Sequence, residues 1–395
     1  MYCWLLGFRE LVRVMGREWQ VWVSPSSQNR RGSDMSLPSQ GSEKQTLSAV
    51  TLASCVALFV SFLGLSQFDL PIVRYMRSVT TYFSSEQLTI TWLAVMNYVG
   101  NWIGSELHIV GLCLGLLALG WVRQQPSLIV AAVQSVIGLG MVTVVVNSLK
   151  HLIGRPRPKF THTGDWHIGV AWDSGFDSFP SGHSAVSFVV ATVLAKRFPV
   201  IGPFCLGVAA FAALSRIPRG SHFLTDVVAG AILGILSGLL AAAPLTQWRV
   251  SIADGLRHGA VGASMVLMIL WVLARPMDDG MVGMLLLAVA AVAILGGLWL
   301  HRGRWSTTGQ SPKGWQTKAS FLLIASGLAA LTTSPLVLTS VGLACLAVWF
   351  TPFVPSNTTD QPVSPWSAWH EGALLGGLIV GISLLIGARE VLPFQ

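Results

Sequence analysis

Three short segments between residues 150 and 226 hold the side chains whose types and spacing could carry chemistry. They are Lys150 with Arg155-Pro156-Arg157-Pro158, then Pro180-Ser181-Gly182-His183, then Ser215-Arg216 with His222 and Asp226. Arginine and lysine bind the oxygens of a phosphoryl group, and histidine can act as a nucleophile or as an acid and base. The combination indicates transfer of a phosphoryl group.

The third segment supplies a candidate nucleophile. Residues four apart share one face of a helix, so Asp226 can reach the ring of His222. A carboxylate hydrogen-bonded to one imidazole nitrogen fixes the tautomer and makes the other nitrogen a better nucleophile. It also stabilises the positive ring that forms when that nitrogen bonds to phosphorus.

The other two segments predict a site for the phosphoryl group itself. Ser181-Gly182-His183 opens a helix, whose N-terminal N–H groups and dipole favour an anion. His183 is placed there to protonate a leaving oxygen. Lys150, Arg157 and Arg216 can surround the group and stabilise a crowded transition state without a metal.

Taken together, Lys-x6-Arg-Pro, Pro-Ser-Gly-His and Ser-Arg-x5-His-x3-Asp resemble the three motifs of the type 2 phosphatidic acid phosphatase superfamily. The resemblance covers about residues 47–243. It implies a six-helix core, a phosphohistidine at His222 with Asp226 as its partner, and His183 as general acid. It further implies phosphate binding by Lys150, Arg157, Ser181, Gly182 and Arg216, with no metal and no other cofactor.

Composition predicts an all-α, polytopic membrane protein. Hydrophobic residues make up 52% of the chain and charged residues 11%, with a mean hydropathy of +0.63, whereas soluble domains carry about 25% charged residues. Nucleic acid is disfavoured as a partner despite the net charge of +8, because basic loops also set membrane topology. The apolar stretches predict spans near 47–65, 107–122, 128–149, 184–196, 200–215 and 224–243. The amphipathic stretch 68–105 is predicted to lie at the membrane interface.

Two further regions flank this core, which we take as 46–243. Residues 1–45 are predicted to be a disordered cytoplasmic tail. Residues 244–395 form a block of about three to five more membrane helices, near 258–274, 281–300 and 372–388, with 320–353 as two short spans or one kinked span. The role of this block is open.

Several residues outside the motifs have simpler interpretations. Arg155, Lys159 and Arg219 are interpreted as interfacial anchors or as guides for an anionic headgroup. The His and Asp residues of 161–177 indicate substrate gating or solvation more than a metal site. Small residues spaced four apart predict close helix packing at Gly230, Gly234 and Gly238, and a similar series near 372–381 could form a contact in a homo-oligomer.

The motifs leave the exact reaction open. Hydrolysis of a lipid phosphate or polyprenyl pyrophosphate is the leading hypothesis. A lipid phosphotransferase is an alternative because it shares the first half-reaction, and a lipid transporter is a weaker alternative. If the tail is cytoplasmic, most basic loop residues lie inside, as is usual. The site then lies on the outer face of a bacterial inner membrane, and its own basic residues are the exception to the usual distribution.

Overall fold

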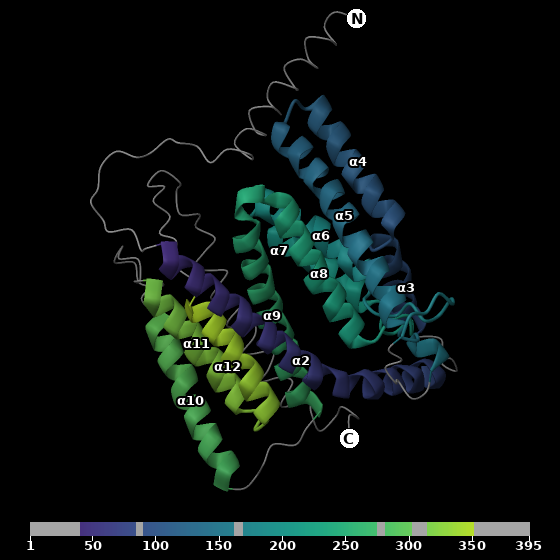
Figure 1. Cartoon of the computed structure of the whole chain (residues 1–395). Helices are drawn as coiled ribbons and strands as arrows, with labels where there is room; N and C mark the ends of the chain where they lie inside the picture. Colours follow the sequence, from purple (N-terminus) through teal and green to yellow (C-terminus); the bar gives the residue numbers. More distant parts are fainter. Residues whose placement is uncertain (1–39, 84–89, 162–168, 275–280, 302–313, 351–395) are drawn as a thin grey trace, which may run out of the picture. The chain divides into compact units, whose positions relative to one another are not determined.

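The computed structural model describes residues 40–83, 90–161, 169–274, 281–301 and 314–350, and every regular element in these ranges is a helix (Figure 1). This confirms the predicted all-α class. Five helices are long and apolar enough to cross a membrane, and a bent pair, Asn97–Ile103 with Glu106–Val122, would make a sixth span. The chain is a membrane protein by these criteria.

The described residues fall into two compact units. Unit 1 is built on Asp69–Gly255, and unit 2 on residues 40–68 and 256–350. The long helix α2 (Gln40–Phe83) begins in unit 2 and ends in unit 1, and α9 (Trp248–Ala274) begins in unit 1 and ends in unit 2. The division between the units thus falls inside these two helices, after Phe68 and after Gly255.

Unit 1 carries the helices that hold the three motifs. After the end of α2 come α3 (Ile90–Ile103), α4 (Glu106–Val122) and α5 (Pro126–Ile153), then α6 (Gly182–Arg197), α7 (Gly202–Leu214) and α8 (Leu224–Ala242). Short 3-10 turns lie at Pro158–Phe160 (η1) and Leu245–Gln247 (η2). Helix ends agree with the predicted spans within a few residues from α4 to α8.

Helix α6 is the centre of this unit, since it packs against α5, α7 and α8. Its small and β-branched residues from Ser184 to Leu194 are nearly all buried. The predicted glycine ridge on α8 is confirmed. A side chain at Gly230 or Gly234 would collide with the backbone of α6 at Ser181 and Ala185, and one at Gly238 with Val189.

Unit 2 contains the start of α2 and the end of α9, with α10 (Met281–His301), α11 (Gly314–Ala330) and α12 (Pro335–Phe350). Figure 1 shows α10, α11 and α12 side by side. The stretch 320–353 is thus two helices with a break at Leu331–Ser334, one of the two predicted alternatives. The predicted helix at 372–388 and residues 1–39 of the predicted tail lie outside the described residues. Residues 40–45, predicted to be disordered, are instead the first residues of α2.

The interfacial position of residues 68–105 stays a prediction, but residues 68–83 continue α2 as one helix, and Asp69 on it is 3% exposed. By length and composition, the first apolar helix extends from Leu47 to Arg77, beyond the predicted end near residue 65. Asp69 can be buried there because Arg155 neutralises it, as described below.

Candidate active site

His222 lies in the connection between α7 and α8 and is 3% exposed. Its Nδ1 atom is 2.7 Å from the backbone carbonyl oxygen of Ser178. A carbonyl can only accept, so Nδ1 carries the proton and donates it, which leaves the lone pair on Nε2. The geometry therefore leaves Nε2 as the ring nitrogen with an unprotonated lone pair, which is what a nucleophile requires.

Burial also keeps this imidazole neutral. Burial lowers the pKa of His222 below its ordinary value of 6.5, and the opposing effect of the nearby Asp226 carboxylate does not offset it. A neutral ring is the form that can attack phosphorus.

Asp226, in the first turn of α8, is fully buried and held on every side. One carboxylate oxygen accepts from the backbone N–H of Phe223 (2.8 Å) and from the hydroxyl of Ser178 (2.6 Å). The same oxygen lies 3.8 Å from Nδ1 of His222, an ion-pair distance that exceeds a hydrogen bond. Ser178 therefore connects the two, because its hydroxyl donates to Asp226 and its carbonyl accepts from His222.

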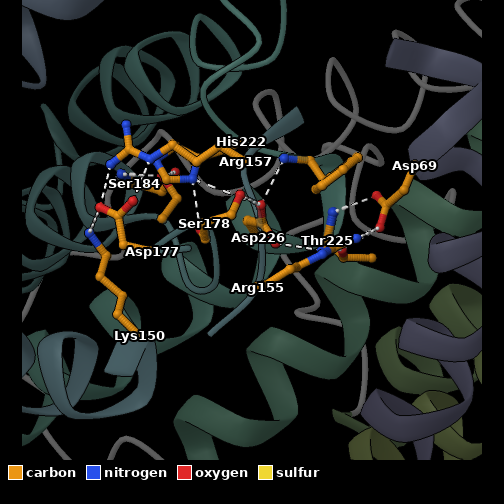
Figure 2. Close-up of polar contacts among 12 residues, drawn as sticks. Asp69, Lys150, Arg155, Arg157, Asp177, Ser178, Ser184, His222, Thr225 and Asp226 are labelled. Atoms are coloured by element: carbon orange, nitrogen blue, oxygen red, sulfur yellow. Dashed lines mark hydrogen bonds and ion pairs between the residues drawn. The ribbon is translucent and has the colours of Figure 1, made fainter. Parts of the chain in front are cut away.

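A buried arginine lies on the far side of Asp226 from the histidine (Figure 2). Arg155 has no exposed surface, and its guanidinium donates to Asp226 (2.5 Å), to Asp69 (2.9 Å) and to the hydroxyl of Thr225 (2.8 Å). Both interpretations of Arg155 given from the sequence, interfacial anchor and headgroup guide, are therefore wrong. Two carboxylates satisfy its charge inside the protein.

The second motif begins α6 as predicted. Ser181 is the N-cap, its hydroxyl accepts from the N–H of Ser184 (3.4 Å), and Gly182 is the first helical residue. The N–H of Ser181 donates to the carbonyl of Asp226 (3.0 Å), which fixes the start of α6 against the first turn of α8. A side chain at Gly182 would lie 3.7 Å from Nζ of Lys150, so the lysine approaches this helix start closely.

His183 follows at the second position of α6. Burial, the charge of Arg216 and the neighbouring His222 and Lys150 lower the pKa of His183 to about 3. In the empty site His183 is neutral. A phosphate dianion would counter the cations and favour its protonation.

The predicted cations converge on the same place. Lys150 ends α5, Arg157 follows it, and Arg216 lies just after α7. Arg216 is 5% exposed, donates to the side-chain carbonyl of Asn101 (2.8 Å), and has an Nε atom with no hydrogen-bond partner in the described part of the chain. Burial, Arg219 and Arg157 lower its pKa to about 10, which leaves it charged. Positive charge is thus concentrated around His222 and His183.

Asp177 is a member of this site that the motifs did not identify. Its carboxylate accepts two hydrogen bonds from Arg157 and lies 3.9 Å from Nζ of Lys150 (Figure 2). Burial alone would raise the pKa of Asp177, but the hydrogen bonds and charge of Arg157 and the charge of Lys150 lower it overall. Three more of the His and Asp residues of 161–177, namely His162, Asp165 and His167, lie outside the described residues.

Sequence comparisons agree with this geometry. Residues 131–249, which contain every predicted site residue, match the model of the PAP2 superfamily. This confirms the predicted resemblance.

Similar curated proteins carry related names. A lipid A 1-phosphatase of Porphyromonas gingivalis is 33% identical over 112 residues, which are 27% of this chain and 22% of that protein. A lipid A 1-phosphatase of Rhizobium johnstonii is 33% identical over 101 residues, 25% of this chain and 41% of that protein. A probable lipid phosphate phosphatase beta of Arabidopsis thaliana is 32% identical over 133 residues, 27% of this chain and 61% of that protein. The chain thus spans less than half of the two bacterial relatives, and no solved structure matches it significantly.

Proposed function

We propose that this chain is an integral membrane phosphatase that hydrolyses a lipid phosphate through a phosphohistidine at His222. One observation carries the proposal. A buried, neutral imidazole, with its proton fixed on Nδ1, lies among Lys150, Arg157 and Arg216 at the start of α6. A nucleophile surrounded by fixed positive charge suits an anionic phosphoryl group.

In the first half-reaction, Nε2 of His222 forms a bond to phosphorus as the bond to the leaving oxygen breaks. His183 gives its proton to that oxygen, and the leaving alcohol departs. Arg157, Arg216 and Lys150 balance the charge on the three phosphoryl oxygens. Asp226, 3.8 Å from Nδ1, stabilises the positive charge that the ring acquires.

In the second half-reaction, neutral His183 accepts a proton from water while the water oxygen attacks the phosphohistidine. The bond between phosphorus and Nε2 breaks and inorganic phosphate forms. The proton taken up by His183 is available for the next leaving group. If a lipid hydroxyl reached the site instead of water, the same steps would give a phosphotransferase.

The substrate class is part of the proposal. The candidate membrane spans support a lipid substrate, and the names of the relatives favour a phosphomonoester of lipid A or of a glycerolipid over a polyprenyl pyrophosphate. A crevice lined by Glu106, Asn147, Lys150 and Gly182 lies beside the cations and can take the adjoining part of a headgroup. The distribution of basic residues favours an outer, periplasmic face.

The test is release of phosphate by the purified full chain in detergent with EDTA. The panel is lipid A, phosphatidic acid, undecaprenyl pyrophosphate and a soluble sugar phosphate, with His222→Ala as control. We expect release from a lipid monoester, trapping of a phosphorylated protein by an alkaline quench, in which a phosphohistidine is stable, and loss of both in His222→Ala. Release that survives His222→Ala would refute the nucleophile. Transfer of the phosphoryl group to an added lipid hydroxyl, without release of inorganic phosphate, would favour the phosphotransferase. An impermeant substrate supplied to intact spheroplasts tests the outer face, and no turnover there would contradict it.

A further inference from the structure

Asp177 occupies the place that the proposed function gives to the substrate. Two oxygens of its carboxylate accept from Nε (2.7 Å) and Nη2 (2.5 Å) of Arg157, the paired geometry that an arginine also offers to phosphate. One of these oxygens is also 3.9 Å from Nζ of Lys150. Arg157 and Lys150, two of the three cationic side chains predicted to bind phosphate, are therefore already paired with a carboxylate.

The backbone keeps Asp177 in this position. The N–H of Arg157 donates to the carbonyl of Gly175 (2.8 Å), and the N–H of Ser178 donates to the carbonyl of Arg155 (3.0 Å). These bonds bracket Asp177, so its segment is tied to the segment that carries Arg157. If the Asp177 carboxylate is displaced from Arg157, a rotation of its side chain is therefore enough to bring it back.

The side chain is nevertheless free enough to move. The side chains of Asp177 and Arg157 are 32% and 24% exposed, unlike the buried carboxylates of Asp69 and Asp226. An ion pair with this exposure is weak, because water can replace either partner. A phosphate with two or more negative charges can compete for the same N–H groups.

We propose that Asp177 is an intramolecular competitor of the phosphoryl group. The carboxylate holds Arg157 and Lys150 in position while the site is empty, leaves Arg157 when a substrate phosphate binds, and returns as inorganic phosphate departs. It limits the affinity for phosphate and so reduces inhibition by the product. The inference rests on the proposed function, because it takes Arg157 and Lys150 as phosphate ligands.

The experiment compares the full-length wild type with Asp177→Asn, which keeps the shape of the side chain and removes its charge. Inorganic phosphate is the probe, and two quantities are measured: its inhibition constant against the best lipid substrate and its dissociation constant by calorimetry. We expect both constants to fall about tenfold in Asp177→Asn, since the competing charge is gone. Asp173→Asn is the matched control, because Asp173 is an exposed aspartate of the same segment, and it should leave both constants unchanged.

Other outcomes separate the possible failures. Unchanged constants in Asp177→Asn, in a wild type that turns over lipid, would overturn the competitor role. Raised constants would also overturn it and would make Asp177 a residue that positions Arg157 for the substrate. A wild type with no turnover on any lipid would count against the proposed function, while a tighter calorimetric constant in the variant would still support competition at Arg157. Asp177→Ala gives a second variant if the asparagine form does not fold, with the same expected direction.

Discussion

Asp69→Asn should destabilise unit 1 much more than an ordinary surface substitution of the same kind. Asp69 accepts from Arg155 (2.9 Å), from the N–H of Thr225 (3.0 Å) and from the hydroxyl of Thr225 (2.5 Å). Arg155 and Asp69 have side chains that are 1% and 3% exposed, so water cannot replace the lost contact.

The magnitude follows from what remains after the change. Removing one member of a buried ion pair costs about 3–5 kcal/mol when the other is left unpaired. Arg155 keeps Asp226 at 2.5 Å, and asparagine keeps one carbonyl oxygen for Thr225. The cost should therefore lie near the lower end, about 3 kcal/mol. Because Arg155 also holds Asp226, kcat should fall while KM changes little.

The assay measures the free energy of unfolding in mixed micelles by titration with a denaturing detergent. The kcat and KM values of each variant are measured as well. Asp254→Asn is the control, since the pair of Asp254 with Lys196 is 4.0 Å long and its side chains are 27% and 55% exposed. An exposed pair of this kind is worth about 0–1 kcal/mol. Equal losses of stability in Asp69→Asn and Asp254→Asn would refute the argument that the Arg155 cluster is a buried support of the site.

Two further predictions concern packing and pH. Gly230→Ala should lower the free energy of unfolding by about 1–3 kcal/mol and reduce turnover, because the new Cβ meets the carbonyl of Ser181 at the start of α6. Gly207→Ala, with open space at that position, should be neutral or slightly stabilising. Equal thermal unfolding of the two variants would contradict this. Because the pKa of His222 lies below 6.5 and only the neutral ring attacks, kcat/KM should stay level as the pH falls through 6.5 and decline only at lower pH; a pH–rate profile with its acid limb above 6.5 would show that the ring is not the buried, neutral group described.

The sequence was sufficient to predict that the residues proposed to bind the phosphoryl group come together. Each lies at the end of a span or in a short connection, and spans are readable because a helix in lipid must be apolar over about 20 residues. From their positions alone, His222, His183 and the three cations could therefore be predicted to share one side of the membrane. The spacing of four between the glycines of α8 likewise predicted the close approach to α6 that the structure shows.

The residues that support the site could not be found in this way. Arg155 and Asp69 are 86 positions apart, and each alone looks like a charge at the edge of a membrane span. The polar residues of 68–83 suggested an interfacial segment because a sequence window shows polarity but not the partner that neutralises it. Asp177 is one of the residues of 161–177 for which the sequence indicates gating or solvation, because its bonds to Arg157 join side chains 20 positions apart.

Asp226 shows what these long-range contacts add to the chemistry. A spacing of four suggested that one carboxylate both orients the ring of His222 and balances its charge. In the structure these tasks are divided: the carbonyl of Ser178 accepts a hydrogen bond from Nδ1, and Asp226 acts over 3.8 Å as a fixed negative charge. Because a carbonyl cannot remove that proton, the positive charge of the proposed phosphohistidine would stay on the ring beside Asp226. Arg155 shares that carboxylate on its other side, so the amount of negative charge that Asp226 offers to His222 is set by a residue outside the three motifs.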